Sequence, residues 1–350
     1  MAALASATRT ARTTVVLVNY NGDADTRRCL ASLAAAGAPP VVIVDNASEQ
    51  IGFEDVLAGY PGASALLRMR ENVGFGRANN VGIAHALRGG ASFVFVLNND
   101  TVVEADTLAR LEAALDAEPT RGLATPRTVY LEAPDVLWYG GGEVSWLRGS
   151  AVAPGYGGAA EAPLAMTPRP VGFASGCAML LRAEALRDAG GFDPRYFMYE
   201  EDVELSLRLQ RAGWSLWYEP TSFLYHRVGG SSTASEASTS QRGRRAGNPR
   251  LAFYLHHQTR NRILTALRHA RGLDALRFWL GFPVYWTALL VRYASQGRLD
   301  AAAAAARGAV SALKAARGAT DPPPQFDGCA LADERVVRQE EHRSVTSNTP

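Results

Sequence analysis

Short β-branched runs alternate with longer amphipathic segments through the first third of the chain. The runs Val15–Val18, Val41–Val44 and Phe93–Leu97 are typical of buried strands. The full pattern predicts strands over 13–21, 41–46, 65–70 and 93–97, and helices over 25–36, 76–87 and 105–117. Because strands that alternate with helices form parallel sheets with right-handed crossovers, we expect an α/β protein with a doubly wound sheet.

The pattern changes in the middle of the chain. Residues 129–170 are rich in Gly, Pro and Trp without a clear period, which predicts short antiparallel strands and loops that form one wall of a site. Regular structure is expected again over 173–181. Helices are predicted over 183–189 and 201–212, a last strand over 216–226, and a mainly helical region over 251–316.

Polar residues gather where the predicted strands end. They are Asn19-Tyr20-Asn21, Asp45-Asn46-Ala47-Ser48, Asn98-Asn99-Asp100, the acids Glu200-Glu201-Asp202 at a helix start, and His226. In open α/β sheets, ligands bind where the strands end, because the loops there converge on one crevice. Carboxylates, carboxamides and an imidazole in such a crevice indicate a hydrophilic ligand and a divalent cation, since Mg²⁺ and Mn²⁺ prefer oxygen ligands. The pattern therefore predicts an enzyme site.

Each of these motifs also has a purely structural interpretation. The Asn98–Asp100 turn would cap the following helix, and a single histidine such as His226 is more often structural than a ligand. Acids in a first helical turn are favoured by the helix dipole, which is also expected to lower their pKa and keep a base there ionised. Three consecutive acids, Glu200–Asp202, nevertheless exceed what capping requires.

The glycines of Gly74-Phe-Gly76-Arg-Ala-Asn79 superficially resemble a dinucleotide fingerprint. The sixth position is Asn79, and the segment follows the third predicted strand rather than the first, so a nicotinamide-dependent oxidoreductase is a poor interpretation. Glycines before a helix can still let backbone N–H groups approach a phosphate or a ribose.

Composition and cysteine spacing favour a globular protein of a reducing compartment. Of the 350 residues, 47% are hydrophobic and 20% charged, as in ordinary globular proteins. The three cysteines, Cys29, Cys177 and Cys329, lie far apart and form neither a metal motif nor a disulfide framework. The first dozen residues lack an apolar core, so we predict no signal peptide and favour a frayed terminus over a transit peptide.

The net charge of +2 conceals a basic C-terminal region. Between Gln241 and Gly318 there are fourteen Arg or Lys and two acids. Within this region the apolar run Phe278–Val291 is bracketed by Arg277 and Arg292. Its fourteen residues, which include Pro283, fall short of the ~20 that span a bilayer. A helix in the headgroup region of an anionic leaflet and a helical hairpin packed on the core are equally favoured, ahead of a partner-protein surface.

Taken together, these motifs resemble a family 2 glycosyltransferase of the GT-A fold, from the rhamnosyltransferase and galactofuranosyltransferase branch. The resemblance covers about residues 13–230, with a weaker similarity at Arg260-Asn261-Arg262. It is carried by Val18-Asn-Tyr-Asn-Gly22, Val44-Asp-Asn-Ala-Ser48, Asn72-Val-Gly-Phe-Gly-Arg-Ala-Asn-Asn80, Leu97-Asn-Asn-Asp-Thr101, Ser175-Gly-Cys-Ala-Met-Leu-Leu-Arg182, Gly190-Gly-Phe-Asp193, Tyr199-Glu-Glu-Asp-Val-Glu-Leu205 and His226.

The resemblance implies inverting transfer of a sugar from a nucleoside diphosphate to a hydroxyl of a growing glycan or glycolipid. Asp202 would be the general base, with Glu201 as the alternative, and Asp100 and His226 would hold Mg²⁺ or Mn²⁺. Asp45 would bind the nucleotide base, and Asn98 replaces the first acid of the strict metal-binding pattern. The wider set expected to bind the nucleotide sugar is Asn19, Tyr20, Asp45, Asn72, Gly74, Asn79, Asn98 and Asn99.

These motifs are shared by enzymes that use different sugar donors, so the donor and the cellular location are expectations. We expect dTDP-L-rhamnose as donor, with UDP-galactofuranose or another UDP-hexose as the alternative. Other classes left open are a non-catalytic sugar-nucleotide binder and a nucleotidyltransferase, although no Arg/Lys-rich triphosphate loop is evident near Gly22. We expect a cytoplasmic enzyme at the inner face of the membrane, with a lipid-linked glycan acceptor and no nucleic-acid partner.

The same reasoning predicts five segments. They are a disordered N-terminus over 1–12, a catalytic domain over 13–228, a flexible loop over 229–250, a basic helical region over 251–317 and a disordered tail over 318–350.

Overall fold

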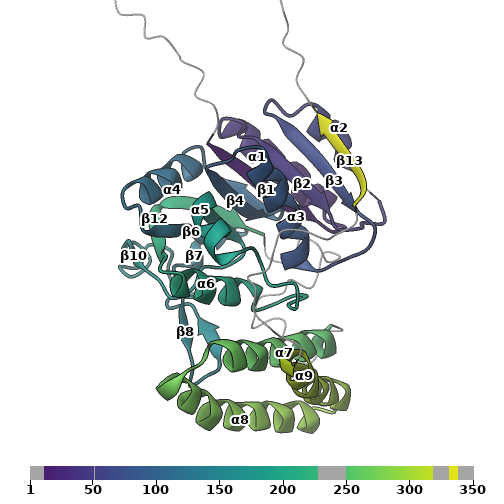
Figure 1. The fold of residues 1–350 in the computed structure, drawn as a ribbon, viewed down its shortest axis with the longest axis vertical. Helices are drawn as coiled ribbons and strands as arrows, with labels where there is room; N and C mark the ends of the chain where they lie inside the picture. Colours follow the sequence, from purple (N-terminus) through teal and green to yellow (C-terminus); the bar gives the residue numbers. More distant parts are fainter. Residues whose placement is uncertain (1–11, 51, 228–249, 318–330, 338–350) are drawn as a thin grey trace, which may run out of the picture.

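A mixed sheet forms the body of the molecule (Figure 1). The computed structural model describes residues 12–50, 52–227, 250–317 and 331–337. The first four strands are parallel neighbours in the order β4-β1-β2-β3, and their bounds are β1 (Thr13–Asn19), β2 (Val41–Asp45), β3 (Ser64–Met69) and β4 (Phe93–Asn98). They are connected through helices α1 (Asp23–Ala35), α2 (Glu54–Ala58) and α3 (Phe75–Arg88).

The register of this parallel half brings the polar strand ends together. Asn19 at the end of β1 pairs with Asp45 at the end of β2, and Val18 pairs with Asn98 at the end of β4. Since the strands run in the same direction, their carboxyl ends lie along one edge of the sheet. The sequence motifs that follow these strands therefore share that edge.

Helices cover both faces of the sheet, as its doubly buried strands require. On one face, Val15 and Leu17 pack with residues of α1 and of α4 (Thr107–Asp116). On the other, Val16 packs in a cluster with residues of α3, α5 (Ala183–Ala189) and α6 (Glu201–Arg211). The alternation of side chains along β1 thus supplies both cores.

The second half of the sheet mixes strand directions. Strand β11 (Ala178–Arg182) runs antiparallel between β4 and β6 (Arg121–Tyr130), and β12 (Ser215–His226) runs parallel to β6. The sequence pattern missed most of β6. Short strands complete this half: β5 (Thr101–Val103), β7 (Ala133–Tyr139), β8 (Glu143–Ser145), β9 (Ser150–Val152) and β10 (Arg169–Pro170). The antiparallel β8–β9 hairpin agrees with the short strands predicted for residues 129–170.

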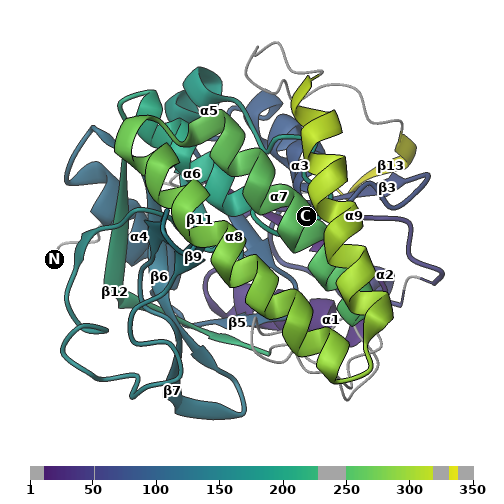
Figure 2. The same cartoon turned by 90° about the horizontal axis from the view of Figure 1, so that it is seen from below.

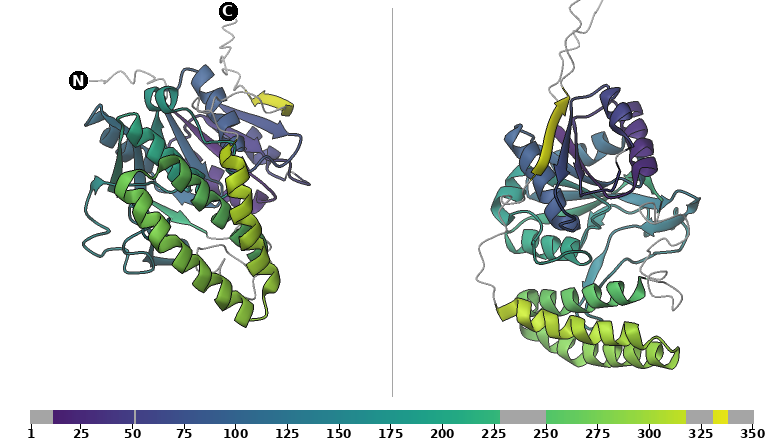
Figure 3. Two further views of the ribbon diagram at one scale, coloured as in Figure 1. Left: turned by 60° about the horizontal axis from the view of Figure 1, so that its bottom comes forward. Right: turned by 90° about the vertical axis from the view of Figure 1, so that its right-hand side faces the viewer.

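Three helices form a separate layer below the sheet and its covering helices (Figures 1 and 3). They are α7 (Leu251–His269), α8 (Gly272–Ser295) and α9 (Leu299–Arg317). Helix α8 lies on the outside of this layer when the molecule is seen from below (Figure 2). Trp146, from the β8–β9 hairpin, packs in the same apolar cluster as Phe278 and Phe282 of α8, which ties the layer to the body. Among the described residues, no helix combines the length and apolarity needed to cross a bilayer.

The α/β class, the mostly parallel sheet and the C-terminal helices are confirmed. The disordered tail predicted over 318–350 is wrong for Leu331–Val337, which form strand β13 antiparallel to the edge strand β3. Most of the predicted N-terminal segment (1–11), most of the predicted loop (228–249) and the rest of the tail lie outside the described residues.

Candidate active site at the carboxyl edge of the sheet

Asn19 is the centre of a buried polar cluster at the end of β1. Its side chain is completely buried, and its Nδ2 donates to Asp45 Oδ1 at 3.0 Å and to Ser48 Oγ at 3.1 Å. Its Oδ1 accepts hydrogen bonds from Thr26 Oγ1 at 2.9 Å and from Asn99 Nδ2 at 3.3 Å. One side chain thereby joins the ends of β1, β2 and β4, so Asn19 organises the floor of the site.

Asp45 lies in the same floor and is also fully buried. Besides Asn19, its carboxylate accepts a hydrogen bond from the Ser48 backbone N–H at 3.2 Å, and Arg68 Nε lies 4.0 Å away. Asp45 thus contacts groups of the protein itself, whereas the Tyr20 side chain is 42% exposed. A nucleotide at this edge would meet Tyr20 before Asp45.

The glycine-rich segment before α3 lies close to the loop that leads to the acids. Gly74 has φ +84°, and a Cβ there would collide with the backbone carbonyl of Phe197. Asn72, which is half-buried, accepts hydrogen bonds from Asn46 Nδ2 and from the Gly74 N–H, both at 3.0 Å. Asn79 is buried in α3 and donates to the Phe75 carbonyl at 3.0 Å. A glycine is therefore required at position 74 because the backbone there lies against the Phe197 carbonyl, which is a contact within the protein and not with a ligand.

Asn98 at the end of β4 and the two residues that follow it, Asn99 and Asp100, have different surroundings. Asn99 is buried and donates to Thr26 Oγ1 at 2.8 Å, so it belongs to the floor. Asn98 is half-buried at the strand end. The Asp100 carboxylate lies 3.1 Å from His226 Nε2, because β5 pairs antiparallel with β12 and sets Thr101 opposite His226. The structure therefore brings together the two residues predicted to bind metal, 126 positions apart.

His226 is held between an aromatic ring and two acidic groups. Its ring meets that of Trp138 edge-on, with centroids 4.4 Å apart. Burial alone would lower the pKa of His226, but the nearby Cys177 sulfur and the Asp100 carboxylate outweigh it and raise the pKa well above its usual value. Burial has the opposite effect on the Cys177 thiol, whose pKa it raises. The tight His226–Asp100 pair is the electrostatic centre of this part of the site.

The geometry of this pair fits a divalent cation. Neighbouring ligands of an octahedral ion at about 2.1 Å lie about 3 Å apart, which matches the separation of Asp100 Oδ1 and His226 Nε2. In the described part of the chain, no third His, Cys, Asp or Glu joins them in a metal-binding group. Mg²⁺ commonly takes one or two protein ligands and completes its shell with substrate phosphates and water, so a diphosphate ligand would supply what the protein lacks.

The acids at the start of α6 form the second part of the site. Asp202 accepts hydrogen bonds from the backbone N–H groups of Gly176 at 3.0 Å and Val203 at 2.8 Å. Burial raises the pKa of Asp202 against the lowering effect of these bonds. Burial and the neighbouring Asp202 charge raise the pKa of Glu201 well above its usual value. The expected lowering by the helix dipole is wrong, because burial outweighs the local helix field.

Segment 176–177 connects the two parts. The Gly176 N–H binds Asp202, and the Cys177 carbonyl accepts the Asn98 N–H at 2.8 Å. Cys177 also lies beside His226. The candidate base and the candidate metal pair are therefore separated by only this short segment.

Helix α7 holds the loop that leads to Glu201 and Asp202. Asn261 is fully buried, and its Nδ2 donates to the carbonyls of Met198 at 2.9 Å and Tyr199 at 2.8 Å. Tyr199 and Glu200 have φ of +70° and +69°, a conformation that is unfavourable for residues other than glycine. Arg262 pairs with Glu200 at 3.1 Å. Contacts from α7 therefore stabilise the strained entry to α6.

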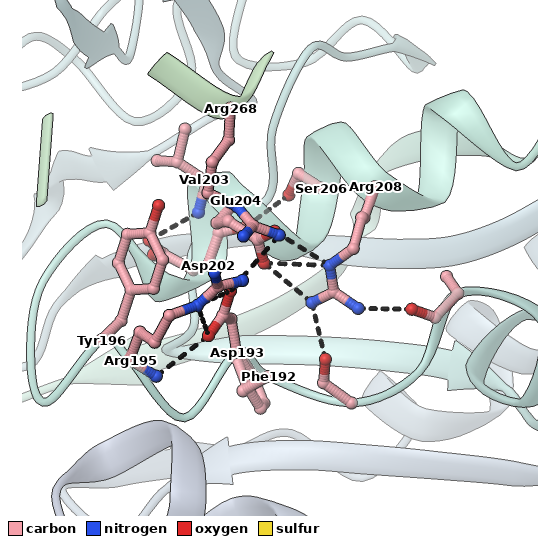
Figure 4. A network of polar contacts seen from close by, with 12 residues as sticks. Phe192, Asp193, Arg195, Tyr196, Asp202, Val203, Glu204, Ser206, Arg208 and Arg268 are labelled. Carbon is pink, nitrogen blue, oxygen red and sulfur yellow. Dashed lines mark hydrogen bonds and ion pairs between the residues drawn. The ribbon is translucent and has the colours of Figure 1, made fainter. Parts of the chain in front are cut away.

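A buried charge network fixes α6 to the same helix (Figure 4). Glu204 is fully buried, pairs with Arg208 at 2.8 Å and contacts His269 Nε2 at 3.1 Å. Burial alone would raise the pKa of Glu204, but these partners lower it to about 2. Arg268 of α7 reaches Asp193 at 3.6 Å, beside the Asp193–Arg195 pair. Removing Arg208 would take from the buried Glu204 carboxylate its shortest ion pair, which is destabilising.

Sequence reasoning did not assign roles to Ser48, Gly176 or Asn261. The Ser48 hydroxyl binds both Asn19 and the Asn21 N–H. Gly176 acts through its backbone, which no side-chain pattern can reveal. Only the weak resemblance at 260–262 pointed toward Asn261.

Comparison with known proteins identifies the class of enzyme. A family model described as glycosyltransferase like family 2 matches residues 11–248. The chain belongs to this family. A related protein of Mycobacterium tuberculosis, N-acetylglucosaminyl-diphospho-decaprenol L-rhamnosyltransferase, is 30% identical over 294 residues, which cover 78% of this chain and 88% of the relative. The pre-mycofactocin glycosyltransferase of the same organism is 30% identical over 214 residues, 61% of this chain and 42% of that protein.

Solved structures agree with the GT-A fold. A mannosyltransferase from Pyrobaculum calidifontis, in complex with GDP-Man and Mn²⁺, matches with a TM-score of 0.52 at 19% identity, over 88% of this chain and 82% of that one. GalNAc-T7 with UDP, GalNAc and Mn²⁺ matches with a TM-score of 0.50 at 16% identity, over 76% and 52% of the two chains. The predicted GT-A fold and the transferase class of this family 2 member are thereby confirmed.

Proposed function

We propose that this glycosyltransferase moves L-rhamnose, with inversion, from dTDP-L-rhamnose to a hydroxyl of a lipid-linked N-acetylglucosaminyl acceptor. The observation that carries the proposal is the similarity along nearly the whole length of a relative named for that acceptor and sugar. The Asp100–His226 pair and the acids at the start of α6 supply groups for a reaction of this kind. The enzyme acts at the inner face of the membrane, where such an acceptor is embedded.

The donor lies along the carboxyl edge of the sheet in this proposal. Tyr20, Asn72 and Asn98 are the accessible members of the predicted nucleotide-sugar set, whereas Asn19, Asp45 and Asn99 support them from the buried floor. Asp100 and His226 would hold the divalent cation. When bound, such a cation stabilises the negative charge that develops on the departing diphosphate.

Asp202 serves as the general base. It takes the proton of the acceptor hydroxyl while that oxygen forms a bond to the anomeric carbon of rhamnose. The bond from this carbon to the diphosphate oxygen breaks at the same time, and its electron pair leaves with dTDP. Burial raises the pKa of Asp202, so its carboxylate accepts the proton more readily than that of an exposed aspartate.

Competition among nucleotides tests the donor assignment. Full-length enzyme is titrated with a fluorescent sugar-nucleotide analogue in Mn²⁺, and dTDP, UDP and GDP are used as competitors. We expect dTDP to displace the analogue at the lowest concentration. A clear preference for UDP would overturn rhamnose in favour of a UDP-hexose or UDP-galactofuranose. Binding without any release of nucleoside diphosphate, when an acceptor is supplied, would identify a non-catalytic binder.

A further inference from the structure

Helix α8 carries a continuous apolar stripe on its outer side. Leu273, Leu276, Leu280, Val284 and Val291 are between 54% and 72% exposed. Their spacings of three, four, four and seven residues put all five on one face of an α-helix. A stripe of this length on the surface of a globular protein marks a site of interaction rather than chance exposure.

The opposite face of the same helix is already occupied. Phe278 and Tyr293 are completely buried, and Phe282 is 4% exposed. Phe278 and Phe282 pack with residues of α7 and with Trp146, whereas Tyr293 packs with residues of α7 and α9. Helix α8 is therefore anchored to the protein by one face, and the stripe is not needed to hold it there. The two expectations for this run are thus compatible, since the helix packs on its neighbours and still presents an apolar face.

The charges around the stripe favour an anionic surface. From Arg250 to Arg317 the chain has eleven Arg or Lys and two acids. Both acids, Asp274 and Asp300, pair with arginines at 3.1 Å and 2.9 Å. Arg271, Arg277 and Arg292 of α8 and its N-terminal flank are exposed. A second copy of the chain would bring equally basic faces together, whereas an anionic lipid surface complements them.

We propose that the outer face of α8, defined as Leu273, Leu276, Leu280, Val284 and Val291 with the flanking Arg271, Arg277 and Arg292, lies in the headgroup region of an anionic lipid bilayer. The helix rests on the membrane rather than crossing it, as expected for an apolar stripe on a helix with a basic flank. The purpose of this membrane contact, which is to hold the enzyme beside a lipid-linked acceptor, rests on the proposed function, whereas the contact itself does not.

Vesicle sedimentation tests the surface without any sugar substrate. Full-length protein is mixed at low salt with vesicles of phosphatidylcholine alone or with equal parts of phosphatidylglycerol. We expect binding to the anionic vesicles only, and weaker binding as salt rises. Leu276→Glu/Leu280→Glu should weaken binding at least tenfold. Replacing Arg277 or Arg292 by Gln should each weaken it by about fivefold, since a basic residue near the surface contributes about 1 kcal/mol.

The controls separate this surface from the proposed activity. Leu164→Glu/Met166→Glu places the same two charges at residues that are 46% and 43% exposed outside the helical layer, and this variant should bind vesicles like the wild type. Nucleotide binding should be unchanged in every variant. Failure of the wild-type protein to bind anionic vesicles overturns the proposal and leaves the donor assignment intact. Loss of a dimer in Leu276→Glu/Leu280→Glu, with vesicle binding unaffected, would also overturn it by assigning the face to a second copy.

Discussion

Replacing Asn261 by alanine should reveal that helix α7, which lies outside the central sheet, positions the candidate catalytic acids of α6. The side chain is fully buried and donates one hydrogen bond each to the carbonyls of Met198 and Tyr199. The alanine variant leaves both carbonyls without this donor. At about 1–3 kcal/mol for each unsatisfied buried group, with partial relaxation, the free energy of unfolding should fall by about 2–4 kcal/mol. For a protein of this size the Tm should fall by roughly 3–5 °C.

The catalytic effect should be distinct from the loss of stability. Without Asn261, the left-handed backbone at Tyr199 and Glu200 loses the two hydrogen bonds that hold its approach, so Asp202 is less well positioned. A displacement of about 1 Å in a reacting group can cost about 100-fold in rate, so we expect kcat to fall at least tenfold. The KM for the nucleotide sugar should stay within about twofold of wild type, because the predicted donor residues lie at the sheet edge.

The assay measures kcat and KM at a temperature at which both proteins are fully folded by circular dichroism. Asn261→Asp keeps the shape of the side chain but removes both donated hydrogens, so it should behave like the alanine variant. Gln258→Ala, at a half-buried neighbour on the same helix, is the matched control and should retain activity. A stable Asn261→Ala enzyme with wild-type kcat would refute the positioning role.

Two further predictions concern the acids and the metal pair. Asp202→Asn should lower turnover by ~100-fold or more while donor binding persists, whereas Glu201→Gln should retain activity, because burial favours the neutral form of Glu201. The pKa of Glu201 is raised in the folded state, so the folded state keeps a proton that the unfolded state releases above about pH 4.3. The contribution of Glu201 to the free energy of unfolding therefore falls as pH rises. The Tm of Glu201→Gln relative to wild type should therefore increase with pH; a constant difference would contradict this assignment. A chelator should abolish transfer, and Mn²⁺ or Mg²⁺ should restore it. Asp100→Ala should lose metal-dependent donor binding. The activity of His226→Ala should be partly rescued by excess metal. Full activity in chelator would exclude the metal role.

The parallel half of the sheet could be predicted because each of its strands is marked by a short, continuous run of residues in the sequence. The β-branched strands β1, β2 and β4 are apolar and end in polar residues, and parallel register then brings those ends together. Strand β6 was missed because Gly122 and Pro126 interrupt its apolar run, and Pro126 is accommodated beside a register shift with β12. Strand β13 is rich in charge and forms only through pairing with the distant β3.

The electrostatics of the site depend on burial, which sequence does not show. The acids Glu201 and Asp202 stand at a helix start, where the dipole lowers a pKa, yet burial raises both pKa values. The hydrogen bonds of Asn261 cross 62 and 63 positions of the chain and follow from the packing of α7 alone. Sequence could therefore name the candidate acids but neither their protonation nor their support.

The most direct test of the proposed function is the product of one reaction. Full-length enzyme is incubated with dTDP-L-rhamnose, Mg²⁺ and a GlcNAc-diphospho-lipid in anionic vesicles, and the products are analysed by mass spectrometry. We predict that the acceptor gains one deoxyhexose, that dTDP is released in equal amount, and that Asp202→Asn forms little product. No transfer from dTDP-L-rhamnose, together with transfer from a UDP-sugar to the same or another acceptor, would contradict the proposed reaction.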